Sequence, residues 1–204
     1  MSRRATLIAG IALVCAGAAV ALAAGLSGGD KRHHASTALL GPTMPANFRA
    51  AAFTLHDSTG RSFALRRPGR VVVLTFLHSL CKSTCPVTAQ TIRGALDDLT
   101  ATQRAGVDTY AVTVAPREDT AAHVGAFLRE QRVGSFLHYL TGPLPAVRAV
   151  WKRYGIHPNT QGEDHSAFIL LVDRRGIVRI GYPANETVPE DLAHDLRILV
   201  SGAA

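Results

Sequence analysis

The sequence has no block of lysine and arginine residues interleaved with aromatic residues. Its formal net charge is +7, but four basic residues and one aspartate flank an apolar N-terminal segment. Without these five, 18 basic and 14 acidic residues are spread along the chain. A nucleic-acid-binding protein would gather its positive charge on one face or segment. We therefore exclude nucleic acid as a partner.

Cysteine is also scarce, with three residues in 204. Cys15 lies inside the apolar N-terminal run, so the rest of the chain contains only Cys81 and Cys85. The chain also lacks internal repeats and low-complexity segments. Hydrophobic residues make up 47% of it, and glycine and proline are near average, which indicates a globular body with a proper core.

Residues Ala5 to Leu26 contain no charge. A run of roughly 22 residues is long enough to span a bilayer core, and the preceding Arg3 and Arg4 favour an amino end inside the cell. Residues 1–26 are therefore predicted to be a signal anchor, with a cleaved signal peptide as the alternative. Either way the body is exported. We expect a single-pass cell-membrane protein with its domain on the extracytoplasmic side, or a protein secreted after cleavage.

Residues 27–45 are rich in Gly, Ser, Thr, His and Pro and are predicted to be a flexible tether. From residue 46 to 204, expected strands alternate with expected helices. The strands are predicted at 53–55, 62–65, 71–77, 109–114, 135–140, 167–173 and 177–182. The helices are predicted to follow Pro86, to run from a cap at Asp119-Thr120 to Arg132, and to cover 143–154 and 189–200. This order predicts a three-layer α/β domain with a mixed central sheet.

Cys81 and Cys85 lie between the expected strand at 71–77 and the helix that begins near Pro86. The free N–H groups and the dipole of a helix N-terminus favour a thiolate. Soft thiolates prefer Cu(I) and Zn(II) among common metals. Three roles stay open for the pair: a structural disulfide, a redox-active dithiol or disulfide, and a metal site.

Asp164-His165-Ser166 precedes the strand expected at 167–173. In an α/β fold, functional residues gather in loops at one edge of the sheet, so His165 is a candidate partner of the dithiol. Two thiolates and one imidazole form a ligand set suited to copper. A surface histidine is the alternative interpretation. His78, three residues before Cys81, and His157 are lesser candidates.

Several motifs resemble the Sco/SenC family of membrane-tethered, thioredoxin-fold copper proteins that serve cytochrome c oxidase assembly. The resemblance covers most of residues 50–200 in the family's order. It implies a thioredoxin-like fold, a copper ion held by Cys81, Cys85 and His165, and delivery to an extracytoplasmic acceptor such as an oxidase subunit. The matching segments are Phe53-x-Leu-x-Asp-x-x-Gly60, Val71 to Phe76, Cys81-x-x-x-Cys85-Pro86, Pro116-x-x-Asp-Thr120, Asp164-His165-Ser166, Leu171-Val172-Asp173-Arg174-x-Gly176 and Asp191 to Leu199.

Two positions depart from the family pattern. Lys82-Ser83 stands where the family usually has Pro-Asp, and Ala115 replaces the aspartate of its V-D-P motif. In the family, both of these carboxylates lie near the copper face. We expect their absence here to affect partner docking and Cu(II) affinity.

The rival function is a thiol–disulfide oxidoreductase or a peroxidase on the same fold. A thioredoxin-type enzyme has a CxxC motif and a cis-proline before the facing strand. Here the spacing is one residue wider, and no proline lies between Asp164 and Ala167. A peroxiredoxin would carry P-x-x-x-T/S before a single peroxidatic cysteine, which is absent. Redox cycling of Cys81 and Cys85 stays open, because copper loading requires the reduced dithiol.

Overall fold

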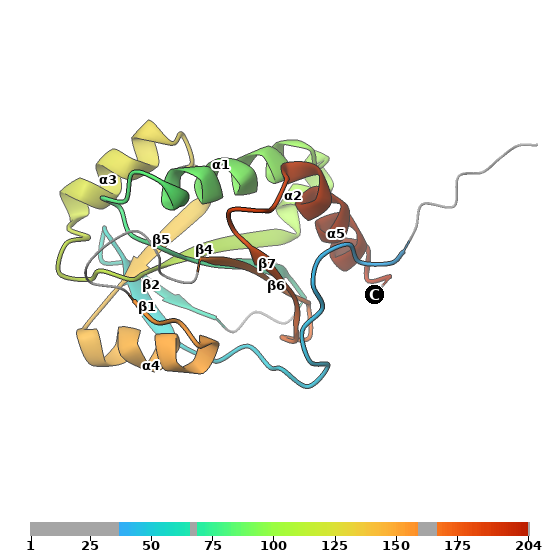
Figure 1. Cartoon of the computed structure of the whole chain (residues 1–204), viewed down its shortest axis with the longest axis horizontal. Coiled ribbons are helices and arrows are strands. Elements are labelled where there is room, and N and C mark those ends of the chain that lie inside the picture. Colours follow the sequence, from blue (N-terminus) through green and yellow to red (C-terminus); the bar gives the residue numbers. More distant parts are fainter. Residues whose placement is uncertain (1–36, 66–68, 159–166, 204) are drawn as a thin grey trace, which may run out of the picture. The chain divides into compact units, whose positions relative to one another are not determined.

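A seven-stranded mixed sheet forms the centre of the computed structural model, which describes residues 37–65, 69–158 and 167–203 (Figure 1). The strand order is β2-β1-β5-β4-β3-β6-β7. Strands β3, β4 and β5 are parallel, and the other pairings are antiparallel. The bounds are β1 Thr54–Asp57, β2 Ser62–Ala64, β3 Val71–Leu77, β4 Val107–Thr113, β5 Leu137–Thr141, β6 Phe168–Val172 and β7 Val178–Pro183.

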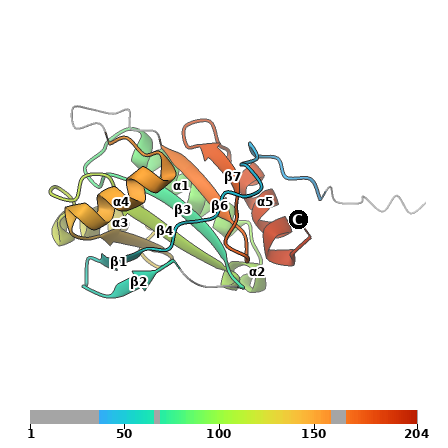
Figure 2. The same cartoon turned by 90° about the horizontal axis from the view of Figure 1, so that it is seen from below.

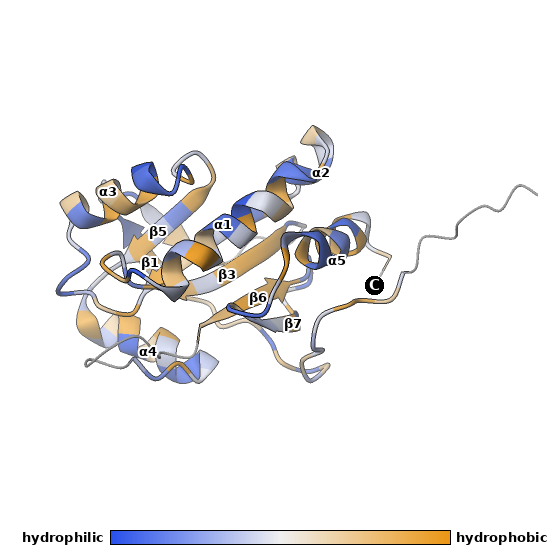
Figure 3. Ribbon diagram, turned by 45° about the horizontal axis from the view of Figure 1, so that its top comes forward, coloured by the Kyte–Doolittle hydropathy of each residue, from blue (hydrophilic) through white to orange (hydrophobic). Residues whose placement is uncertain are grey.

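Strand β3 is buried along its whole length. It pairs with β4 on one side and β6 on the other, and helices or loops cover both of its faces. An uninterrupted β-branched and aliphatic sequence suits such a position, because a strand covered on both faces has no solvent side for polar residues. Figure 3 shows this apolar character along β3 and β6.

Within the described part of the chain, four helices lie on one face of the sheet (Figure 1): α1 Thr84–Asp97, α2 Ala101–Ala105, α3 Ala121–Glu130 and α5 Pro189–Ser201. Helices α1 and α5 enclose one apolar cluster with β3, β6 and β7. Helices α1 and α3 enclose another cluster, which contains Cys85, with β3, β4 and β5. The N-terminal end of α1 is thereby fixed beside the C-terminal end of β3.

Helix α4, Leu144–Tyr154, covers the other face together with the segment that precedes β1 (Figure 2). Val147, Val150 and Trp151 of α4 pack on this side of the sheet. Helix α4 ends at Gly155, whose φ of 66° is in the left-handed region that favours glycine at this position.

The predicted mixed α/β architecture is confirmed, with differences at the element ends. Helix α1 begins at Thr84, so Pro86 is its third residue. Helix α2 was not predicted. Among the described residues, no helix combines the length and apolar composition needed to cross a membrane. The predicted anchor at 1–26 lies outside the described residues, and the boundary at residue 46 stays a prediction.

Part of the segment predicted to be a tether is bonded to the domain in the structure. Thr43 bridges to Ile180 of β7, and the N–H groups of Leu40 and Gly41 donate to the buried carboxylate of Asp195 on α5. Tyr182 donates its hydroxyl to the same carboxylate at 2.7 Å. Asp195 thus joins this segment to α5 and β7.

Candidate metal centre

The two thiols occupy the junction between β3 and α1. Cys81 lies in the loop after β3, and Cys85 is the second residue of α1. Cys81 is partly exposed and Cys85 is buried. Cys81 precedes the helix, and its sulfur accepts the N–H of Cys85 at 3.5 Å.

Cys81 is the partly exposed member of the pair. Partial burial opposes its ionisation, but the backbone N–H groups of Cys85 and Ser83 donate to the sulfur and lower the pKa of the Cys81 thiol below its ordinary value. The Ser83 hydroxyl lies 3.7 Å from the same sulfur. The Cys81 sulfur therefore acts as an acceptor for the N-terminal end of α1, and this geometry favours a thiolate.

Cys85 is fully buried in the apolar cluster between α1 and α3. Burial raises the pKa of the Cys85 thiol far above its ordinary value, and the nearby Cys81 and Asp119 groups add to this effect. The backbone N–H of His78 donates to the sulfur at 3.4 Å and opposes the shift. The pair thus combines an accessible nucleophilic thiol with a protected protonated one.

This asymmetry predicts selective alkylation. In reduced protein carrying Cys15→Ser, iodoacetamide should modify Cys81 first. Its lowered pKa leaves a larger fraction of this thiol ionised than of an ordinary cysteine at any pH below the ordinary pKa. As pH falls through the lowered pKa, the rate should decrease. Cys85 should react only after denaturation. Peptide mass spectrometry across a pH series measures both rates. Equal native-state rates at the two cysteines would contradict this prediction.

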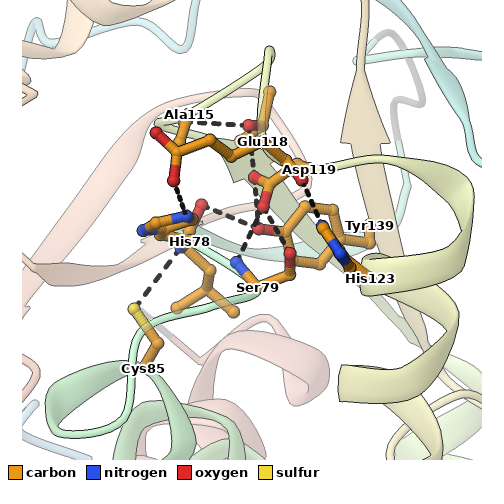
Figure 4. A network of polar contacts seen from close by, with 10 residues as sticks. His78, Ser79, Cys85, Ala115, Glu118, Asp119, His123 and Tyr139 are labelled. Atoms are coloured by element: carbon orange, nitrogen blue, oxygen red, sulfur yellow. Dashed lines mark hydrogen bonds and ion pairs between the residues drawn. The ribbon is translucent and has the colours of Figure 1, made fainter. Parts of the chain in front are cut away.

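The imidazole of His78 lies next to Glu118: its Nε2 is 3.2 Å from a carboxylate oxygen of that residue (Figure 4), while its backbone N–H points to Cys85. The lesser hypothesis that His78 is a metal ligand stays a prediction. His157, the other lesser candidate, is exposed.

The carboxylate of Asp119 is 3% exposed and lies close to the dithiol loop. The sequence predicted a helix cap at Asp119-Thr120. Thr120 does cap α3, since its side chain accepts the N–H of His123. Asp119 instead points inward and bonds Ser79 and Tyr139 (Figure 4). No local pattern revealed these contacts, because Ser79 lies 40 residues and Tyr139 20 residues away in the chain.

His165, the predicted third ligand, lies outside the described residues, as does Asp164. Within the described part of the chain, no three His, Cys, Asp or Glu side chains converge to hold a metal ion. The structure thus supplies two soft sulfur donors at one place. A complete three-ligand site needs a contribution from elsewhere, and the assignment of His165 stays a prediction.

The residues that depart from the family pattern also line this region. Lys82 is exposed beside Cys81. Ala115 provides a backbone carbonyl that accepts the N–H groups of Glu118 and Asp119, both at 2.9 Å. Glu118, whose carboxylate lies 3.2 Å from Nε2 of His78, is the exposed carboxylate next to this turn.

The model of the SCO1/SenC family matches residues 42–201. This chain belongs to the SCO1/SenC family. The match includes the dithiol loop, the Asp119 region and the predicted ligand His165. Among curated proteins, none is similar enough to count as a match.

Several solved structures of the family share this fold. ScoI from Bradyrhizobium japonicum with copper bound is 23% identical, with a TM-score of 0.57 over 74% of this chain and 99% of that one. A SCO1/SenC family lipoprotein from Bacillus anthracis is 23% identical, with a TM-score of 0.66 over 79% and 99%. BsSco, a Sco-family cytochrome c oxidase assembly protein with a disulfide switch, is 22% identical, with a TM-score of 0.65 over 77% and 96%. At these identities the likeness establishes the fold.

Proposed function

We propose that this protein binds copper through Cys81, Cys85 and His165 and passes it to an extracytoplasmic acceptor during cytochrome c oxidase assembly. The observation that carries the proposal is the placement of the two cysteine sulfurs at the N-terminal end of α1, in a chain of the SCO1/SenC family. Copper-bound structures of relatives support the choice of metal. The predicted N-terminal anchor would hold the domain at the membrane, and the Bacillus anthracis relative is a lipoprotein.

The two sulfurs suit different parts of such a task. Cys81 is partly exposed and has a lowered pKa, so it is the sulfur that incoming copper meets first. Cys85 then loses its proton to solvent as the second bond forms, and its burial excludes competing ligands. Ligand exchange at the accessible Cys81 allows copper to pass onward, with the protein as carrier and copper as its cargo.

A spectroscopic titration tests the ligand set. Cu(II) is added to the reduced full-length protein carrying Cys15→Ser, and optical spectra are recorded. A thiolate-to-copper charge-transfer band is expected, and His165→Ala should change or remove it, because imidazole is the third donor. His56→Ala, at an exposed position of β1, serves as the matched control and should leave the band unchanged. Absence of the band, or a band unaffected by His165→Ala, sinks the Cys₂His proposal.

The second candidate function is thiol–disulfide exchange, which the asymmetry of the two thiols favours. The Cys81 thiolate would attack a substrate disulfide, form a mixed disulfide and release one substrate thiolate. Cys85 would then release the second substrate thiol and close the Cys81–Cys85 disulfide, so that two electrons reach the substrate. Catalytic reduction of a protein disulfide, with a strongly reducing dithiol potential, would support this function over copper transfer.

A further inference from the structure

We propose that Asp119 is a positioning residue that holds the dithiol loop in the geometry that accepts copper. This inference rests on the proposed function and adds to it a residue that does not itself touch the metal. Asp119 lies outside the predicted ligand set, and its carboxylate is buried beneath the loop rather than presented at its surface.

The contacts of Asp119 converge on the loop and on the end of β3. One carboxylate oxygen accepts two hydrogen bonds from Ser79, from its N–H at 2.8 Å and its hydroxyl at 2.5 Å. The other oxygen accepts the hydroxyl groups of Thr113 and Tyr139. Tyr139 is also 2.8 Å from the carbonyl of Leu77, the last residue of β3. We call Asp119, Ser79, Thr113 and Tyr139 the Asp119 cluster.

The backbone next to Ser79 is hydrogen-bonded to both cysteines. Ser79 lies between His78 and the cysteines, and the carbonyl of His78 accepts the N–H of Cys81 at 3.1 Å. The N–H of His78 donates to the sulfur of Cys85. A shift of Ser79 would therefore change the turn that places Cys81 and remove a hydrogen bond from Cys85. Outer residues of this kind typically alter metal affinity by about ten- to a hundredfold.

Asp195 provides a matched comparison within the same domain. Its carboxylate is also buried and also accepts a tyrosine hydroxyl and backbone N–H groups, but its partners belong to the N-terminal segment and β7. Replacement of Asp195 removes a similar number of buried hydrogen bonds without touching the Asp119 cluster. It therefore separates a general loss of stability from an effect on the dithiol.

The test compares Asp119→Ala, Asp119→Asn and Asp195→Ala in the full-length protein carrying Cys15→Ser. Cu(I) affinity is measured by competition with a chromogenic chelator, and native-state alkylation of Cys85 provides a copper-independent readout. We expect Asp119→Ala to lower the affinity about tenfold or more and to make Cys85 reactive. Asp119→Asn should recover the affinity to within about threefold, because its amide can bond the same four groups. Asp195→Ala should lower the unfolding midpoint but keep wild-type affinity.

Wild-type affinity and an unreactive Cys85 in Asp119→Ala would overturn this inference while leaving the proposed function intact. An equal loss of affinity in Asp195→Ala would also overturn it. Failure of the parent protein to bind Cu(I) would instead refute the proposed function. If Asp119→Ala does not fold, Ser79→Ala is the deciding variant. Alkylation of Cys85 in its native state, together with a loss of Cu(I) affinity of about threefold, supports the inference. An unreactive Cys85 and a Cu(I) affinity equal to that of the parent protein refute it.

Discussion

Replacement of Cys85 by serine is expected to lower the Cu(I) affinity about thousandfold, or about 4 kcal/mol. The substitution exchanges a soft sulfur for a hard hydroxyl oxygen, and a serine hydroxyl does not ionise near neutral pH. The site would keep only Cys81 among its sulfur donors in the described chain. The fold should persist, because serine is slightly smaller and its hydroxyl can accept the N–H of His78 that now bonds the sulfur.

Chelator competition with Cu(I) measures this loss, and circular dichroism checks the fold. Cys15→Ser is the matched control, since it removes a thiol from the chain without touching the dithiol, and it should bind copper like the unaltered protein. Cys81→Ser should lose affinity to a similar extent. Tight one-to-one Cu(I) binding by folded Cys85→Ser protein would mean that copper uses other ligands.

The framework of the fold was predictable because its strongest signals are local. Strand β3 is recognisable from seven consecutive apolar or β-branched residues, and its burial on both faces matches that pattern. Helix α2 was missed because it has only five residues and lacks a buried face. Its local signal is the capping box, in which Thr100 and Gln103 each accept the other's backbone N–H.

The site was predictable only in part, because the buried residues that support the two cysteines are brought together by long-range contacts. Cys81 and Cys85 stood out from their spacing and their place before a helix. Asp119 did not, because an aspartate before a threonine and an amphipathic stretch also suits a helix start. Its inward orientation follows from Ser79 and Tyr139, which come from other parts of the chain. The packing of β3, β4 and β5 creates this environment, and no local pattern encodes it.

The second large effect concerns stability. Replacement of Asp195 by alanine is expected to lower the free energy of unfolding by about 3 kcal/mol, because it leaves buried donors without their acceptor. The donors are the N–H groups of Leu40 and Gly41, at 2.8 and 3.0 Å, and the hydroxyl of Tyr182. A Cβ atom at position 41 would overlap Ile180 and Tyr182, so the segment approaches β7 as closely as glycine allows.

Urea unfolding of the full-length protein, followed by circular dichroism, measures the effect of Asp195→Ala. Glu190→Ala, in the exposed first turn of the same helix, is the control and should change the free energy by less than about 0.5 kcal/mol. The loss of unfolding free energy in Asp195→Asn should lie between those of the two alanine variants, since one amide oxygen replaces two carboxylate oxygens as acceptor for the two N–H groups. If Asp195→Ala unfolds like Glu190→Ala, the segment at 38–45 contributes little to stability. The larger loss is expected because Asp195 bonds this segment and β7 through one fully buried carboxylate.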